Sequence, residues 1–353
     1  MLYNDCHMKE NAVYYNDYLQ LQNILNSQHP ESFKEGRTPA HDEMLFIVIH
    51  QSYELWFKQL LFEADSAIRI MDQPSINDNT PELQTVVHRL NRVITILKLL
   101  VHQIDIMETM TPMDFLEFRD LLRPASGFQS WQFKTLEARL GLQFRDRFGK
   151  EYYISQLHQP EIDIIKKAEQ ERSLLHVVNK WLERMPYFNN YSQWADFKPT
   201  HTQENVHPFW STYSNCYSNS LAEAERKNLK EFDALFIEGK EHGQLSATAR
   251  RAALFIMLYR GYPLFHLPFQ LLNSLLEIDE QLSTWRYRHM NMVQRTIGTR
   301  IGTGGSTGKE YLKAALDQHY IFKEFAELTS FLIERSKLPE LPASLIMQLS
   351  FNM

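Results

Sequence analysis

Residues 80–107, TPELQTVVHRLNRVITILKLLVHQIDIM, decide the fold predicted for this chain. Their apolar side chains recur in alternating steps of four and three, at Leu83, Val87, Leu90, Ile94, Leu97, Val101 and Ile104. This spacing places them on one face of a helix and is typical of a seam where helix packs on helix. Thr80 and Pro81 suit a helix start, because proline is favoured at the first helical position. The stretch therefore predicts a helix within a bundle.

Helical patterns continue on both sides of this stretch. Residues 41–71 contain no proline or glycine, and their aromatic and apolar residues recur every three or four positions. Shorter helical patterns occur in residues 111–123, 160–184, 221–236, 246–295 and 309–335. No sustained alternation typical of β-strands is present. We therefore predict an all-α fold, with a bundle-like helical domain over residues 40–353 and an N-terminal arm over residues 1–39.

Composition limits the classes of protein to consider. The chain has 353 residues, 44% of them hydrophobic, and a formal net charge of -6 without a long basic run, which argues against nucleic acid or an anionic membrane as a partner. Cys6 and Cys216 are far apart, which argues against a disulfide scaffold, a zinc cluster and covalently attached haem. The most apolar segment, residues 252–278, is interrupted by charged residues and prolines, so no membrane span is expected. A reducing cytoplasm fits these features.

One stretch near the C-terminus combines a histidine with a glycine-rich segment. It reads WRYRHMNMVQRTIGTRIGTGGSTGKEYL, residues 285–312, and holds five of the 12 glycines. The segment fails the phosphate-binding P-loop pattern, because Thr303 replaces the first glycine and Glu310 follows the lysine. His289 on an apolar helix beside a loop suggests one axial ligand to a metal or haem next to a substrate lid. The alternatives are a hydrogen-bonded core histidine and a surface hinge.

Three arginines near this histidine and two further residues are candidates for binding. Arg286, Arg288 and Arg295 are placed to neutralise haem propionates. His50 lies one turn after an aromatic residue and suggests an aromatic pocket with one polar tip; the alternative is a core histidine. Arg119 is suited to bidentate binding of a carboxylate, and the alternative is a surface ion pair with a neighbouring acidic residue.

Three long runs, in this order, resemble the tryptophan 2,3-dioxygenase family. They are HDEMLFIVIHQSYELWFKQLLFE (residues 41–63), PMDFLEFRDLLRPASGFQS (112–130) and WRYRHM followed by GTGGSTG (285–308). The likeness covers nearly the whole chain. It implies an all-helical homotetramer with one haem b, ferrous iron protoporphyrin IX, in each subunit. It also implies cleavage of the indole C2–C3 bond of L-tryptophan with O2 to give N-formyl-L-kynurenine, the first step of the kynurenine pathway.

The resemblance also implies roles for particular residues. His289 matches the axial ligand of the haem iron. His50 matches the distal histidine that hydrogen-bonds the indole N–H, and it is the catalytic candidate. Arg119 matches the arginine that binds the substrate carboxylate. Phe46 and Phe115 match walls of the substrate pocket.

The remaining matches concern the amino-acid end of the substrate and the arm. Thr303 matches a loop threonine that contacts the amino-acid end, and Ser126 and Gly127 lie near the same end. Tyr15 and Tyr18 match tyrosines that a neighbouring subunit contributes to the pocket. The arm is therefore expected to be exchanged between subunits.

Other functions remain open at this point. Indoleamine dioxygenases resemble the chain far less, and a distal histidine such as His50 speaks against them. A haem-dependent monooxygenase acting on a tryptophan derivative belongs to the same fold group. A haem sensor without catalysis is the alternative from another class, although no separate output domain is visible.

Overall fold

The computed structural model describes residues 13–77, 80–147, 155–188, 191–298, 300, 312, 313, 316 and 318–350. Over these residues the regular elements are helices, and the only β-pairing is an isolated bridge between His242 and Leu245. The all-α prediction is confirmed. Among the helices described, none is both long and apolar enough to cross a bilayer.

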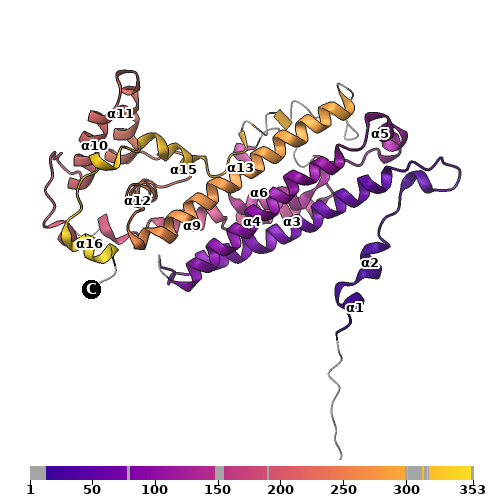
Figure 1. Ribbon diagram of the computed structural model, residues 1–353, viewed down its shortest axis with the longest axis horizontal. Helices are drawn as coiled ribbons and strands as arrows, with labels where there is room; N and C mark the ends of the chain where they lie inside the picture. The colour runs from indigo at the N-terminus through magenta and orange to yellow at the C-terminus, as the bar shows by residue number, and fades with distance from the viewer. Residues whose placement is uncertain are drawn as a thin grey trace, which may run out of the picture.

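Three long helices, α3 (Glu43–Met71), α4 (Pro81–Met107) and α13 (Pro263–Ile297), lie side by side and dominate one half of the molecule (Figure 1). Helix α4 packs between the other two through the predicted seam. Every seam residue is buried except Val101, which is half-buried. Full burial of each such aliphatic side chain stabilises the fold by about 1.5–3 kcal/mol. The seam thus fixes how α13 lies against α4.

A second layer covers the far side of α3. It contains α6 (Trp131–Leu140), α8 (Gln159–Gln170) and α9 (Leu174–Leu182). Helix α6 begins at Ser130, whose side chain accepts the backbone N–H of Phe133 at 3.3 Å, and ends at Gly141 with φ of 134°. A Cβ at Gly141 would lie 2.7 Å from the Leu175 Cβ, so only glycine fits this close approach to α9.

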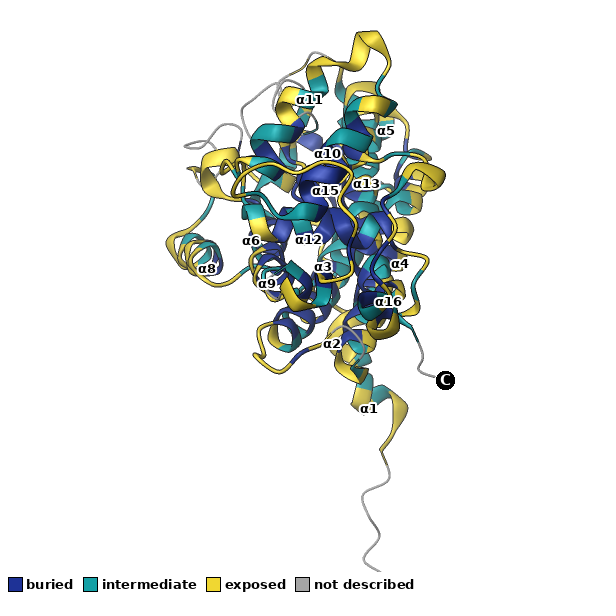
Figure 2. Ribbon diagram, turned by 90° about the vertical axis from the view of Figure 1, so that its left-hand side faces the viewer, coloured by how far each residue is buried: buried dark blue, intermediate teal, exposed yellow. Residues whose placement is uncertain are grey.

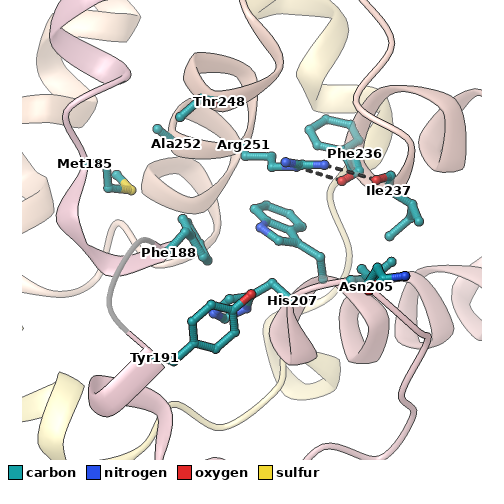
Figure 3. Close-up of a pocket in the computed structure, with 12 residues that line it drawn as sticks. Met185, Phe188, Tyr191, Asn205, His207, Phe236, Ile237, Thr248, Arg251 and Ala252 are labelled. Atoms are coloured by element: carbon teal, nitrogen blue, oxygen red, sulfur yellow. Dashed lines mark hydrogen bonds between the residues drawn. The ribbon is translucent and has the colours of Figure 1, made fainter.

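The opposite half of the molecule holds a compact group of shorter helices (Figures 1 and 2). They are α10 (Pro208–Ser220), α11 (Lys227–Phe232), the π-helical turn η8 (Asp233–Ile237), α12 (Ala247–Leu258), α15 (Lys323–Glu327) and α16 (Ala343–Leu349). Aromatic rings fill the space between them; Phe209, for example, stacks on Tyr213 with centroids 5.9 Å apart. A small cavity lies between α10, η8 and α12 (Figure 3).

The remaining helices are short and connect these layers. They are α5 (Pro112–Phe118), η1 (Glu31–Phe33), η2 (Arg119–Leu122), η3 (Gly127–Gln129), η4 (Phe144–Asp146), η5 (Pro186–Phe188), η6 (Tyr191–Trp194), η7 (Glu223–Glu225), η9 (Leu328–Phe331) and η10 (Arg335–Lys337).

Two sequence expectations differ from the structure in detail. The periodicity over residues 246–295 is divided by a turn into α12 and α13, because Pro263 has no N–H to donate and instead takes the first position of a new helix. Pro268 is accommodated inside α13. The described part of residues 309–335 contains short helices instead of one long helix, and residues 301–311 lie outside the described residues.

The N-terminal arm extends away from the body in Figure 1. It carries α1 (Tyr15–Leu19) and α2 (Leu21–Leu25), which contain no buried residue. Hydrogen bonds tie the chain to α3 from Ser27 onward, where the Gln51 side chain donates to the Ser27 carbonyl at 3.1 Å. The Gln28 side chain donates to Gln51 at 2.7 Å, and the buried Glu43 carboxylate accepts the backbone N–H groups of Glu31 and Ser32 at 2.7 and 2.8 Å.

Candidate functional site

A cavity of about 290 Å³ opens where α3, α5, η2, η3, α6 and α13 meet. Slightly more than half of its lining residues are aromatic or aliphatic, and nearly all of the others have polar side chains. Of the residues singled out from the sequence, it is lined by Phe46, His50, Phe115, Arg119, Ser126, Gly127, Arg286 and His289. The fold therefore gathers residues separated by more than 200 positions around one space.

His289 comes from the C-terminal half of α13 and is enclosed on one side. Its Nδ1 atom is buried and has no hydrogen-bond partner in the described part of the chain. Its ring stacks on Trp285, one turn earlier, with centroids 5.2 Å apart and an interplanar angle of 3°. Burial lowers the pKa of His289 to about 4, and the nearby His50 adds to this effect. The imidazole is therefore neutral at pH 7, the state that binds a metal.

Aromatic packing holds this imidazole in place from behind. Trp285 packs against Phe133 of α6 at 5.0 Å and against Tyr53 of α3 at 6.1 Å between centroids. Tyr53 in turn donates its hydroxyl to the Leu100 carbonyl of α4 at 2.8 Å. The orientation of His289 is thus determined jointly by the helices α3, α4 and α6. The sequence analysis did not identify Trp285 as the residue that positions His289. The signal that could have identified it is its position four residues before His289, which places both side chains on one face of the helix.

His50 enters the same cavity from α3. Its Nδ1 lies 2.7 Å from the Phe46 carbonyl oxygen, which can only accept, so Nδ1 carries the proton. Burial lowers the pKa of His50, while the hydrogen bond to Phe46 and the charge of Glu54 oppose the shift. The neutral ring consequently has an unprotonated Nε2, which can accept a hydrogen bond from a ligand.

Three phenylalanine rings form an apolar wall beside His50. Phe46 lies 4.1 Å from the His50 ring and 5.8 Å from Phe115, and Phe115 meets the buried Phe118 edge-on at 5.4 Å. Arg119 follows directly as the first residue of η2 and is only 5% exposed. Arg119 is therefore not a surface residue, contrary to the alternative considered from the sequence. A buried guanidinium that lines an apolar cavity is suited to bind a carboxylate.

Ser126 and Gly127 lie at the start of η3, at the edge of the cavity. The Ser126 side chain accepts the Phe128 N–H at 3.3 Å, and its own N–H donates to the Gln129 side chain at 3.1 Å. A Cβ built on Gly127 would meet no atom within 4 Å, so this backbone borders open space. A ligand can therefore approach the backbone closely here.

Three predicted site residues are not brought to the cavity by the described chain. Tyr15 and Tyr18 lie on the exposed arm helix α1 and do not line the cavity of their own chain. Thr303 lies outside the described residues, as does the rest of the glycine-rich run 302–308. The preceding Gly298 ends α13 with a φ of 59°, a left-handed value that favours glycine.

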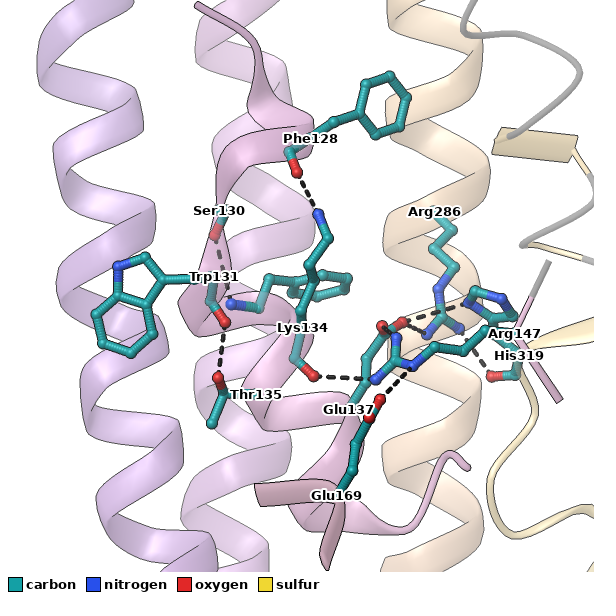
Figure 4. A network of polar contacts seen from close by, with 11 residues as sticks. Phe128, Ser130, Trp131, Lys134, Thr135, Glu137, Arg147, Glu169, Arg286 and His319 are labelled. Carbon is teal, nitrogen blue, oxygen red and sulfur yellow. Dashed lines mark hydrogen bonds and ion pairs between the residues drawn. The ribbon is translucent and has the colours of Figure 1, made fainter. Parts of the chain in front are cut away.

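A buried ionic network that the sequence did not reveal forms one side of the cavity (Figure 4). Glu137 of α6 is 4% exposed and accepts from Arg147 at 2.5 Å and from Arg286 of α13 at 2.7 Å. His319 Nδ1 lies 3.5 Å from the same carboxylate. Burial alone would raise the pKa of Glu137, but Arg147, His319 and Arg286 hold it well below its ordinary value. The network fastens α6 to α13 one turn before His289.

The arginines expected to face haem propionates have other partners. Arg286 pairs with Glu137, and Arg288 pairs with Asp105 at 2.7 Å and with Glu108 at 3.2 Å. Arg295 is exposed and does not line the cavity. Lys134, which the sequence analysis did not select, is a further cation at the cavity wall, beside Arg119 and Arg286. Burial lowers its pKa to about 8, against the opposing charge of Glu137, so it remains charged at pH 7.

Comparison with known proteins identifies relatives along the whole chain. The family model described as "Tryptophan 2,3-dioxygenase" matches residues 4–332. The tryptophan 2,3-dioxygenase of Alteromonas mediterranea is 46% identical, over 98% of this chain and 99% of its own length. That of Bdellovibrio bacteriovorus is 42% identical over 98% of this chain and 100% of its own length. That of Dictyostelium discoideum is 43% identical over 98% of this chain and 90% of its own length.

Proposed function

The chain belongs to the tryptophan 2,3-dioxygenase family, and on this premise we propose that its main cavity is the active site of a haem-dependent dioxygenase. The reaction is the insertion of both atoms of O2 across the indole C2–C3 bond of L-tryptophan, which gives N-formyl-L-kynurenine. One observation carries the proposal: His289 and His50, from two different helices, line the same aromatic cavity beside the buried guanidinium of Arg119.

The residues present fit one haem b. His289 offers a single neutral imidazole whose Nδ1 is enclosed, which leaves Nε2 as the nitrogen for an axial bond to iron. The aromatic and aliphatic lining suits a flat apolar macrocycle, and Lys134 is the candidate counter-charge for a propionate. When bound, the haem would supply the oxygen chemistry, and the protein would supply position and exclusion of water.

Arg119 and His50 would fix the two ends of the substrate. The Arg119 guanidinium would bind the carboxylate in bidentate fashion, with Thr303, Ser126 and Gly127 near the same end. The unprotonated Nε2 of His50 would accept the indole N–H. An indole N–H is far too weak an acid for the His50 imidazole to deprotonate. Burial lowers the pKa of His50 below its ordinary value, which makes this imidazole a still weaker base. His50 therefore orients the ring and is not an obligatory base. Orientation of this kind can lower a barrier by up to about 7–11 kcal/mol.

The proposed assembly is a homotetramer in which the arm of one subunit completes the cavity of another. Two observations support it. The arm helix α1 exposes Tyr15 and Tyr18 and contains no buried residue. Helices α3 and α4 also expose large apolar side chains, which a second copy would cover: Met44, Val48, Leu55, Phe62, Leu99 and Ile106. We place the enzyme in the cytoplasm, where Cys216 would stay a free thiol.

Oxygen consumption tests this function directly. Reduced, haem-loaded protein should consume O2 only after L-tryptophan is added, and the product should be heavier than tryptophan by two oxygen atoms. A product heavier by one oxygen atom would support a monooxygenase instead. Haem binding without tryptophan-dependent O2 consumption would support a sensor.

A further inference from the structure

The second cavity, in the half of the molecule away from His289, contains about 200 Å³ and shares no lining residue with the first (Figure 3). It is bounded by η5 and η6, the start of α10, the turn η8 and α12. An engineered protein cavity of about 150 Å³ holds one benzene molecule. This space is therefore sufficient for a ligand with a single ring.

Aromatic rings make up much of its wall. Phe188 lies 5.3 Å from Trp210 between centroids, Trp210 stacks on Phe236 at 5.8 Å, and Tyr191 faces His207 at 5.1 Å. Flat faces at these separations favour a flat apolar ligand, since offset and edge-to-face ring contacts add to the hydrophobic gain.

Among the residues that the structure describes, two ring N–H groups in this wall have no hydrogen-bond partner. Trp210 is 2% exposed, and its Nε1 atom is buried without a hydrogen-bond partner in the described part of the chain. His207 Nδ1 accepts the backbone N–H of Phe209 at 3.2 Å, so the proton of the neutral ring lies on Nε2. That Nε2 atom is also buried and without a partner over the same residues. Burial lowers the pKa of His207 to about 4, and Arg251 adds to this, so the ring is neutral at pH 7.

A cation without a counter-charge completes the lining. Arg251 of α12 donates through Nε to the Phe236 carbonyl at 2.7 Å and through Nη2 to the Ile237 carbonyl at 3.1 Å, as Figure 3 shows. No carboxylate lies within ion-pair distance of it among the residues described, and neither Asp nor Glu lines the cavity. An uncompensated guanidinium and two unused N–H donors all favour an acceptor with negative charge.

We propose that this second cavity binds a small carboxylate with a single flat ring, held by Arg251, Trp210 and His207. The carboxylate would accept from the three donors, while Phe188 and Tyr191 would contact the ring. The site is independent of the dioxygenase chemistry, because the two cavities have no residue in common.

Calorimetric titration of the haem-loaded protein with benzoate tests the proposal. Arg119→Ala is the background variant, since it removes the carboxylate-binding group of the first cavity. One saturable site per chain is expected there. Benzamide, which has the same shape without the charge, should bind at least about ten-fold more weakly. Trp210→Phe removes one N–H donor and should weaken benzoate binding by about ten-fold.

Arg251→Gln should weaken benzoate binding further, and Arg226→Gln is its matched control. Arg226 is an exposed arginine, so its loss changes the net charge equally without touching the cavity. Arg251 also donates to two carbonyl groups of η8, so the thermal unfolding midpoint of each variant is measured to check that it folds. If Arg251→Gln does not fold, benzoate binding by Trp210→Phe decides the test. Benzoate binding that is absent in the Arg119→Ala background, or unchanged in both cavity variants, would overturn the proposal. Trp210→Phe should also keep its tryptophan turnover. Retained turnover would show that weaker benzoate binding in this variant does not come from damage to the proposed dioxygenase site.

Discussion

At the scale of single residues, the chemistry of the site depends on which imidazole nitrogen of His50 and of His289 can contact a ligand. In His50 the Phe46 carbonyl determines the proton position and leaves Nε2 as an acceptor. In His289 the enclosed Nδ1 leaves Nε2 for a metal. Both pKa values are lowered by burial, so both rings are neutral at pH 7. If His289 holds the haem iron and His50 accepts the indole N–H, as proposed, the same residue type has two different chemical uses within one cavity.

Replacement of His289 should remove the axial haem ligand. His289→Ala is expected to lose the five-coordinate ferrous absorption spectrum and tryptophan turnover together, because no other imidazole on α13 lines the cavity. His266→Ala, an exposed histidine on the same helix, is the control and should keep both. An unchanged ferrous spectrum in His289→Ala would refute the assignment.

Replacement of His50 should impair turnover without abolishing it. The loss of one hydrogen bond to the indole predicts a decrease in kcat/KM of roughly ten-fold to hundred-fold. Steady-state kinetics of His50→Ala beside His88→Ala, an exposed histidine on α4, measure the effect. Complete inactivity with haem and substrate still bound would instead indicate an obligatory base.

Arg119→Ala should act mainly on substrates that carry a carboxylate. Its KM for L-tryptophan is expected to rise by at least about ten-fold, since charge-assisted bidentate bonds are lost. Tryptamine, which lacks the carboxylate, should be affected much less. Arg123→Ala, a nearby exposed arginine, serves as control. Equal losses for both substrates would exclude carboxylate binding as the role of Arg119.

At the scale of elements, long periodic helices were predictable and irregular connections were not. The seam of α4 and the face of α3 followed from spacing alone, because each buries one continuous apolar stripe. The same face of α3 explains why His50 could be selected from the sequence. Its apolar residues extend from Leu60 in the core to Phe46 at the cavity, and His50 lies between them. The family resemblance was needed to choose between the alternative roles that the sequence left open for Arg119 and His289.

The Glu137 network escaped the sequence analysis for a physical reason. Its members come from α6, α13 and two irregular segments, so neither periodicity nor spacing connects them. Only tertiary packing brings Arg147 and His319 to the carboxylate. The sequence therefore identified several of the residues that line the cavity and missed the ionic wall that fastens α6 to α13.

Glu137→Gln should destabilise the fold by about 3–5 kcal/mol, because it leaves buried cations without their counter-charge. The folded-state pKa of Glu137 is lowered, so its contribution is present above the ordinary pKa of 4.5 and is lost as pH falls through the folded value. Urea unfolding should show a large difference between wild type and variant at pH 7 that shrinks below about pH 4.5.

Glu171→Gln, which removes a partly exposed ion pair with Arg139, is the control and should cost at most about 1 kcal/mol. A Glu137→Gln penalty as small as this control, or one independent of pH, would contradict the ionic role.

At the scale of the whole molecule, the arm carries two helices, α1 and α2, that contain no buried residue in a single chain. If it enters a neighbouring subunit, an arm defect and a haem-ligand defect should complement each other. Mixed assemblies of the Tyr15→Ala, Tyr18→Ala double variant with His289→Ala should regain activity above the sum of the two separate proteins. Tyr14→Ala, on the same exposed arm, is the control and should be active alone. Absence of regained activity in verified mixed assemblies would count against exchange.

The continuity of α13 imposes a constraint on chain length. One uninterrupted helix runs from Pro263 to Ile297, and the imidazole at 289 is positioned by packing along that whole rod. Each residue of an α-helix advances about 1.5 Å and turns by about 100°. A single residue inserted or deleted within α13, between Pro263 and Trp285, would therefore rotate the imidazole away from the cavity, whatever its side chain. The number of residues in this helix is thus constrained as well as their chemistry.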